Sequence, residues 1–212
     1  LSPSVFFAVT AVSALGWGKA TLTVPSRWAV GTALLVSMPA VLDAAGPLTG
    51  VDELYLHGGL AQRMALHEGL VGGILHPNGS RPLTLQIIYT GLWSSGHPSS
   101  LSWFHWLLSG GLMVAVVQTG SLHLGSRVAG VAAATLLAGS TTIQESMGQA
   151  ASDLPTALAV LAAMDACNRR RIRSGIIAAA TAMSIKYTSA APLAGIFLAV
   201  RLPIAIRLLA AG

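Results

Sequence analysis

The stretch LSWFHWLLSGGLMVAVVQ, residues 101–118, contains no Asp, Glu, Lys or Arg. It is nearly long enough to cross a bilayer as an α-helix, which takes about 20 apolar residues. The whole chain of 212 residues shares this bias, since 53% of its residues are hydrophobic, 9% are charged and the mean hydropathy is +0.69. Soluble domains carry roughly 25% charged residues. The composition therefore predicts an all-α, polytopic transmembrane helical bundle.

Seven hydrophobic segments of comparable character follow one another along the chain. We expect about six to seven spans that form a single transmembrane domain over residues 1–212, with one large non-spanning loop at residues 43–100. Several segments are shorter than an upright span needs, which predicts tilted, kinked or partial helices, and Pro192 is expected to separate the last two. The segments are residues 4–16, 28–42, 101–118, 126–142, 154–168, 174–188 and 191–207.

The positive charges predict the orientation of these spans. If the loop at residues 43–100 is outside, nine of the twelve Lys and Arg residues fall inside, and the run NRRRIR at residues 168–173 is the largest group. The positive-inside rule then makes Arg169–Arg173 cytoplasmic and the loop extracytoplasmic, as in a bacterial inner membrane. Of the seven acids, only Asp165 falls near the inner face. The net charge of +5 is thus accounted for by topology, and no nucleic-acid partner is expected.

The long loop carries one amphipathic pattern. In ELYLHGGLAQRMALHEGLV, residues 53–71, the side chains of Leu56, Leu60, Met64 and Val71 fall on one stripe at helical spacing. This pattern predicts an amphipathic helix in the plane of the membrane interface. The rest of the loop, including residues 74–83 and 94–100, is rich in turn residues.

Asp52 and Glu53 begin this loop and are followed by Tyr55 and His57. A carboxylate at a membrane edge can act as a general base, hold an acceptor or bind a divalent cation. Alternatively, the two acids belong to a solvated loop and cap the helix that follows. The residues alone leave both interpretations open.

Two further charged residues fall at the same predicted face. Asp153, in AASDLPTAL at residues 150–158, is typical of a helix start, and as an N-cap it can still point into a site. Lys186, in MSIKYTSAAP at residues 183–192, is the one charge inside its hydrophobic segment. A lysine at that depth can pair with a lipid phosphate, or its ammonium group can extend to the interface without a further role.

The remaining metal-ligating residues give weak signals. His57, His67, His76 and His97 all fall in the long loop, but none forms the close pairs typical of zinc sites. His105 lies among Trp103, Phe104 and Trp106, which indicates an interfacial aromatic belt. The single cysteine, Cys167, is expected to be a small buried hydrophobic residue.

Taken in order, these pieces resemble the GT-C superfamily of integral-membrane glycosyltransferases, in particular bacterial proteins similar to protein O-mannosyltransferases and aminoarabinose transferases. The resemblance covers most of residues 28–200, and family members are usually about twice as long, so the chain is expected to correspond to their N-terminal membrane module. It rests on a span followed by DELYLH (52–57), an amphipathic helix, HPNGSRPL (76–83), LHLGSRVAGVAAATLLA (122–138), ASDLPTALAVLAAM (151–164), a basic loop and SGIIAAATAMSIKYTSAAPLAG (174–195).

The resemblance implies transfer of a sugar from a polyprenyl-phosphate donor at the extracytoplasmic face. It implies that Asp52 is the base or the carboxylate that organises a divalent cation (Mg²⁺ or Mn²⁺), with Glu53 beside it. Asp153 would be the second acid and Lys186 a partner of the donor phosphate. Tyr55 and His57 would be candidate substrate contacts.

A second hypothesis belongs to another class of protein. The chain is then a non-catalytic, GT-C-like scaffold subunit within a larger membrane complex, such as an energy-transducing, respiratory or photosynthetic one. Its partners would be other membrane subunits, and in either case membrane lipids. Whether the chain is an enzyme is left open by the sequence.

Overall fold

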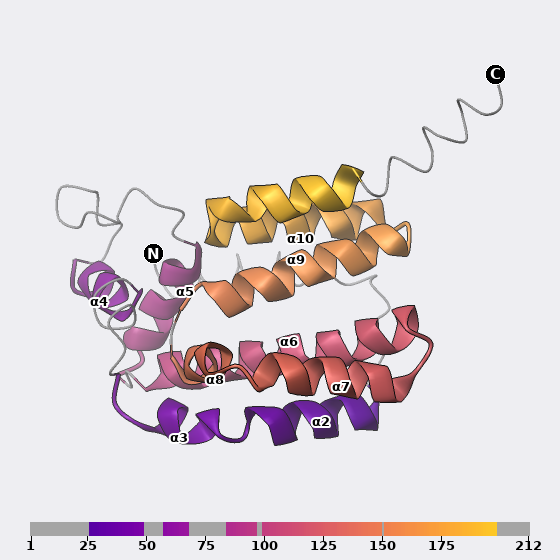
Figure 1. Cartoon of the computed structure of the whole chain (residues 1–212). Helices are drawn as coiled ribbons and strands as arrows, with labels where there is room; N and C mark the ends of the chain where they lie inside the picture. The colour runs from indigo at the N-terminus through magenta and orange to yellow at the C-terminus, as the bar shows by residue number, and fades with distance from the viewer. Residues whose placement is uncertain (1–25, 49–56, 68–83, 97–98, 150, 199–212) are drawn as a thin grey trace.

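The computed structural model describes residues 26–48, 57–67, 84–96, 99–149 and 151–198, and every regular element in these ranges is helical (Figure 1). The predicted all-α fold is therefore confirmed for the described part of the chain. Its helices are α2 (Arg27–Ser37), α3 (Ala40–Ala45), α4 (Gly58–Leu66), α5 (Thr84–Trp93), α6 (Ser100–His123), α7 (Arg127–Ala138), α8 (Thr141–Gly148), α9 (Asp153–Asn168), α10 (Ile172–Ile185) and the 3₁₀ turn η2 (Tyr187–Ser189), which continues as helix over residues 190–198.

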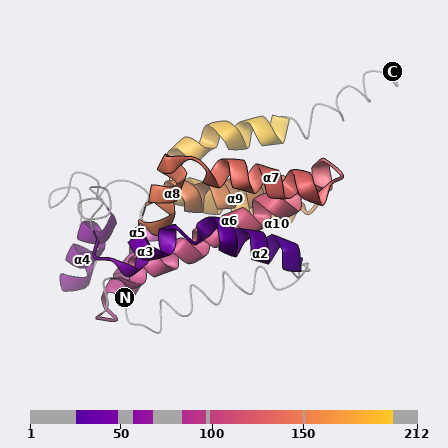
Figure 2. The ribbon, with the colours of Figure 1, turned by 60° about the horizontal axis from the view of Figure 1, so that its bottom comes forward.

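Helix α6 forms the centre of the bundle, with α2, α7 and α9 packed along it (Figure 2). Met113 and Val117 of α6 are buried against small side chains such as Ala134 of α7. Small residues let helix backbones approach closely. Gly130 of α7 lies so near α6 that a Cβ there would collide with the Val117 carbonyl. Close packing of small residues is therefore what joins α6 to α7.

The predicted segment at residues 28–42 is interrupted where α2 ends and α3 begins. Pro39 has no N–H to donate and cannot continue the hydrogen bonds of α2. Two side chains satisfy carbonyls at this break, because Trp106 Nε1 donates to Ser37 O at 3.0 Å and Gln144 Nε2 donates to Val36 O at 2.9 Å. The break is thus tied to α6 and α8 rather than left open.

Among the described residues, one helix, α6, is long and apolar enough to cross a membrane by length and composition. Helices α8 and α9 pass the same test only as a pair bent by 100°, which is the form of a broken span or of a re-entrant loop. The shorter apolar helices are Arg127–Ala138, Ile172–Ile185 and Tyr187–Leu198. The predicted segments at residues 101–118, 126–142, 154–168 and 174–188 overlap α6, α7, α9 and α10. The segment at 191–207 overlaps the helix at residues 190–198, and residues 199–207 and 4–16 lie outside the described part. The total of six to seven spans stays a prediction.

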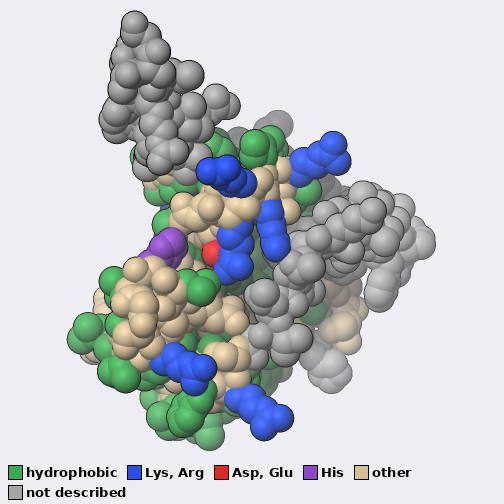
Figure 3. Space-filling view, turned by 90° about the vertical axis from the view of Figure 1, so that its right-hand side faces the viewer, with side chains coloured by type: hydrophobic (Ala, Val, Ile, Leu, Met, Phe, Trp, Pro, Cys, Tyr) green, Lys and Arg blue, Asp and Glu red, His purple; other side chains and the backbone are tan. Residues whose placement is uncertain are grey.

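The bundle has two chemically different ends. The start of α2 and the α6–α7 and α9–α10 turns lie at one end, and α4, α5 and α8 lie at the other (Figure 1). We call the first the basic end, because Lys and Arg side chains gather there (Figure 3), and the second the acidic end. Arg27, Arg127, Arg169, Arg170, Arg171 and Arg173 belong to the basic end, and Asp43, Glu145 and Asp153 belong to the acidic end.

The predicted loop at residues 43–100 contains two described helices, α4 and α5. As the stripe predicts, Leu60 and Met64 of α4 are buried. They pack with Ile87 of α5, so another helix covers this apolar face and lipid is not required to do so. Leu56 and Val71 lie outside the described residues. The sequence pattern predicts no helix at residues 84–93, where the structure has α5.

Candidate functional site

Three of the predicted site residues, Asp52, Glu53 and Tyr55, lie outside the described residues. The other three, His57, Asp153 and Lys186, are described, and all three lie at the acidic end. His57 precedes α4, Asp153 begins α9 and Lys186 follows α10. Of these three, the structure brings Asp153 and Lys186 into direct contact, although they are 33 positions apart in the sequence.

Asp153 and Lys186 form a direct ion pair. Nζ of Lys186 donates to Oδ1 of Asp153 at 2.5 Å. The side chain of Lys186 is 36% exposed and that of Asp153 is 67% exposed. The sequence predicts Asp153 as the N-cap of this helix. In the structure Ser152 is the N-cap, and Asp153 is the first helical residue. Its carboxylate is favoured there by the helix dipole and points to Lys186, so the pair crosses from α9 to α10.

A local backbone change brings Lys186 to this position. Helix α10 ends at Ile185, and Lys186 adopts an extended conformation with φ −149° and ψ 114°. Ile185 packs against the cluster formed by Leu85, Tyr89 and Leu101. The end of α10 is therefore anchored on α5 and α6, and the lysine that follows is directed to the surface at the acidic end.

His57 contributes to a buried polar pair rather than to a solvated loop. Nε2 of Gln86 lies 2.7 Å from Nδ1 of His57, and the two residues are only 7% and 8% exposed, respectively. The amide group of Gln86 and the imidazole of His57 are therefore hydrogen-bonded to each other. This bond fixes the start of α4 to α5.

Tyr89 and His105 form a second buried pair beside the first. Both side chains are fully buried, and the Tyr89 hydroxyl lies 3.2 Å from Nδ1 of His105 and 3.3 Å from the carbonyl oxygen of Ala151. The Tyr89 hydroxyl donates to the carbonyl oxygen of Ala151 and is also hydrogen-bonded to the imidazole of His105. His105 is therefore a buried interhelical residue, and its assignment to an aromatic belt is wrong.

These two pairs form one connected network. The rings of His57 and Tyr89 meet edge to face with centroids 6.3 Å apart. Tyr89 then reaches Ala151, two residues before Asp153. Within the described part of the chain, Oε1 of Gln86 is buried without a hydrogen-bond partner.

Sequence reasoning missed Gln86, Tyr89 and His105 as members of this site. A signal was present, because Gln86 and Tyr89 are three residues apart in an otherwise apolar helix and so share one face. A polar residue on the buried face of an apolar helix needs a partner. That reasoning identifies a buried polar face but not the partner, since His105 and Ala151 come from other segments.

The metal predictions concern mostly residues that the structure does not describe. Within the described ranges no group of three or more His, Cys, Asp or Glu side chains is placed to hold a metal ion. His67 ends α4 and is exposed, and His76 and His97 lie outside these ranges, as do Asp52 and Glu53. The divalent cation implied for Asp52 stays a prediction. Cys167 is buried, as expected.

The geometry defines a class: a helical bundle with at least one helix that can cross a membrane by length and composition, and with buried polar pairs and an exposed ion pair at one end. No protein family model, curated protein or solved structure matches the chain. The resemblance to the GT-C superfamily therefore stays a prediction from the sequence.

Proposed function

We propose that this protein is a membrane glycosyltransferase of the GT-C type, which transfers a sugar from a polyprenyl-phosphate donor at the extracytoplasmic face. The observation that carries the proposal is the meeting of Asp153 and Lys186 at the acidic end. The sequence resemblance implies that Asp153 is an acid of the site and that Lys186 is a partner of the donor phosphate. A carboxylate and an ammonium side by side match the two charges that such a transfer needs.

The membrane orientation supports the same proposal. The arginines of the basic end belong on the cytoplasmic side under the positive-inside rule, which puts Asp153, Lys186 and the neighbouring polar network on the opposite side. The bundle spans the membrane six to seven times in this proposal, with the shorter apolar helices tilted or broken. Asp52 and Glu53 precede His57 by five and four residues in the sequence, and the proposal assigns them to the same end.

The chemistry assigns different tasks to the acids and the lysine. The bond between the sugar C1 and the donor phosphate breaks as a bond from the acceptor oxygen to C1 forms. A carboxylate takes the acceptor proton, and the family resemblance assigns this role to Asp52. The leaving group is polyprenyl phosphate. Lys186 stabilises the charge on that phosphate. A donor phosphate competes with Asp153 for Lys186, and the displaced carboxylate is then available to the sugar or the acceptor.

The test is a transfer assay on the full-length protein in lipid nanodiscs. The donor is a polyprenyl-phosphate hexose labelled in the sugar, and the measurement is release of polyprenyl phosphate. Asp52→Asn is expected to lower the rate by roughly 100-fold or more, as loss of a general base does, and Lys186→Met to lower kcat/KM for the donor. Asp165→Asn, at the basic end, is the matched control and leaves the rate unchanged. Equal rates for all of these variants would exclude the proposed site.

One observation favours the scaffold hypothesis as a second candidate. The charge of Lys186 is already neutralised by Asp153, and the His57–Gln86 and Tyr89–His105 pairs join α4, α5 and α6. Interhelical polar pairs of this kind also serve assembly alone. Under this hypothesis the protein releases no polyprenyl phosphate and co-purifies in fixed ratio with other membrane subunits. The ratio of this protein to co-purifying membrane subunits after mild solubilisation therefore separates the two candidates.

A further inference from the structure

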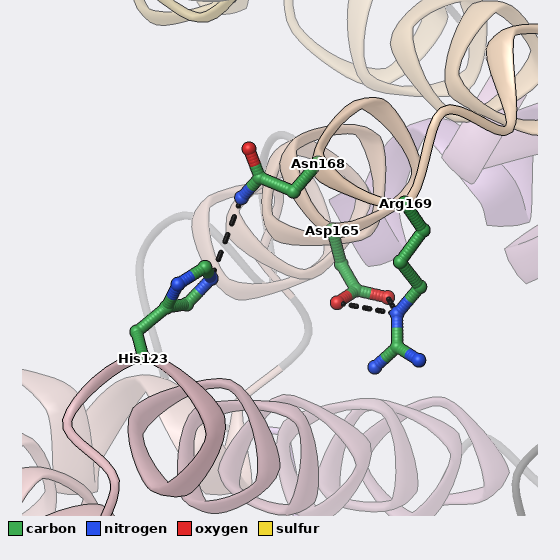
Figure 4. Close-up of polar contacts among 4 residues, drawn as sticks. All are labelled: His123, Asp165, Asn168 and Arg169. Atoms are coloured by element: carbon green, nitrogen blue, oxygen red, sulfur yellow. Dashed lines mark hydrogen bonds and ion pairs between the residues drawn. The ribbon is translucent and has the colours of Figure 1, made fainter.

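The basic end carries a dense set of exposed arginines. Arg27, Arg127, Arg170 and Arg173 are exposed, and Arg171 is half-buried. Among the described acids only Asp165 lies at this end, and it already pairs with Arg169 at 2.8 Å, four residues later on the same helix (Figure 4). His123 of α6 approaches Asn168 of α9 at 3.4 Å, so the α6–α7 and α9–α10 turns lie next to each other. The end as a whole has a large excess of positive charge (Figure 3).

Arginines occupy both parts of the α9–α10 turn, the end of α9 and the start of α10. The N–H of Arg171 bonds to Ala166 O at 2.8 Å and that of Arg170 to Cys167 O at 3.0 Å, which is the arrangement of a Schellman turn. Arg170 holds the left-handed position of this turn, with φ 57°, where glycine is the usual residue. Helix α10 then begins without a side-chain cap, so its first N–H groups point into the same region.

Exposed apolar side chains surround these arginines. Ile172, between Arg171 and Arg173, is 67% exposed, and Ile176 one turn later is 55% exposed. Leu124 and Val128, on either side of the α6–α7 turn, are 65% and 77% exposed. Free phosphate or a nucleic acid would leave this apolar surface in water. A ligand with both an anionic group and hydrocarbon covers the arginines and the apolar side chains together.

We propose that the basic end is a binding site for anionic phospholipids, in which headgroup phosphates contact Arg170, Arg173 and Arg127 while acyl chains cover Ile172, Ile176 and Val128. Arg is suited to this role because its guanidinium group binds phosphate through two parallel hydrogen bonds. The site is independent of sugar transfer and of the Asp153–Lys186 pair, which lies at the other end of the bundle. It depends only on the charge and the apolar surface described above.

The test compares lipids on the purified full-length protein in neutral detergent, where membrane topology has no influence. Dioleoylphosphatidylglycerol is the anionic probe and dioleoylphosphatidylcholine is the matched neutral lipid, and binding is measured by native mass spectrometry. Each cation near an anionic lipid surface contributes roughly fivefold in affinity. The double variant Arg170→Gln with Arg173→Gln is therefore expected to bind phosphatidylglycerol on the order of 25-fold more weakly, with unchanged binding of phosphatidylcholine.

Two control variants keep the proposal falsifiable. Arg170→Lys with Arg173→Lys preserves the charge and is expected to lose only the part of the affinity that the guanidinium geometry supplies. Arg63→Gln, which removes one charge from the acidic end, leaves phosphatidylglycerol binding unchanged. If the double Gln variant does not fold, the single variant Arg173→Gln takes its place, with a fivefold loss expected. Equal binding of both lipids by the wild type, or equal phosphatidylglycerol binding by wild type and the Gln variants, would overturn the proposal.

Discussion

Removal of a single hydroxyl group tests the buried network at the acidic end. In Tyr89→Phe the ring keeps its edge-to-face contacts with His57 and with Phe104, whose centroid is 6.4 Å away. The hydroxyl's bonds to His105 Nδ1 and to the carbonyl of Ala151 are lost. The buried His105 and the half-buried carbonyl of Ala151 are then left without the bond that Tyr89 supplied. The variant therefore isolates the hydrogen bonds from the packing of the ring.

The expected cost follows from the two groups that lose their partner. A buried donor or acceptor left unsatisfied costs roughly 1–3 kcal/mol, so the free energy of unfolding is expected to fall by about 2–4 kcal/mol. For a chain of this size each kcal/mol corresponds to roughly 2–4 °C in Tm, which gives a decrease of about 5–15 °C. The measurement is thermal unfolding in detergent micelles, followed by circular dichroism.

Tyr187→Phe is the matched control. Tyr187 begins η2 and is 60% exposed, and loss of an exposed hydroxyl changes stability by no more than about 0.5 kcal/mol. The Tm of this variant is therefore expected to stay within about 2 °C of the wild type. If Tyr89→Phe shifts the Tm no more than Tyr187→Phe does, Tyr89 does not stabilise the α8–α9 connection through Ala151 and the network is not a structural unit.

Three further predictions concern other parts of the bundle. Gly130→Ala introduces a Cβ against the Val117 carbonyl and is expected to lower stability by roughly 1–3 kcal/mol. Gly31 has open space around it, so Gly31→Ala is expected to raise stability by up to about 1 kcal/mol. Equal Tm values for the two variants would contradict the packing of α7 on α6. Arg170→Gly relieves the left-handed backbone and is expected to raise the free energy of unfolding by about 1 kcal/mol in chemical denaturation; a decrease would show that the turn is not strained. Asp153→Asn and Lys186→Met are each expected to cost less than about 1 kcal/mol, because the pair is exposed; a loss of several kcal/mol would assign the pair a structural role.

The sequence predicts the helices better than it predicts their contacts. Residues 154–168 were expected as one segment, and α9 covers Asp153–Asn168. Hydrophobicity and helix-start signals are local properties, so the sequence of such a segment predicts its helix without knowledge of the helices that pack against it. The bend between α8 and α9, and the helix α5 within the loop, depend on which surfaces are available for packing. No periodicity in residues 84–93 or 141–148 contains that information.

Trp106 shows the same limit at the level of one side chain. Its neighbours in the sequence indicate a membrane-interface aromatic residue, and a tryptophan at an interface directs its N–H to water or headgroups. In the structure its N–H is donated to Ser37 O, a carbonyl at the break caused by Pro39. The end of α2 leaves its last carbonyls without a donor from the same helix, but the residue that donates to Ser37 O lies 69 positions away. A sequence can thus show that a polar group needs a partner before it can show which partner it has.

The polar interactions at the two ends differ in a way that bears on function. At the basic end the ion pair Asp165–Arg169 joins residues four apart on one helix and is partly exposed, so it constrains little beyond that helix. At the acidic end His57, Gln86, Tyr89 and His105 are buried and join α4, α5, α6 and the start of α9. A buried polar pair contributes little net stability over an apolar one, yet it fixes which surfaces meet. The polar groups of this bundle therefore specify geometry at the acidic end, where Asp153 and Lys186 are held, and supply mainly charge at the basic end.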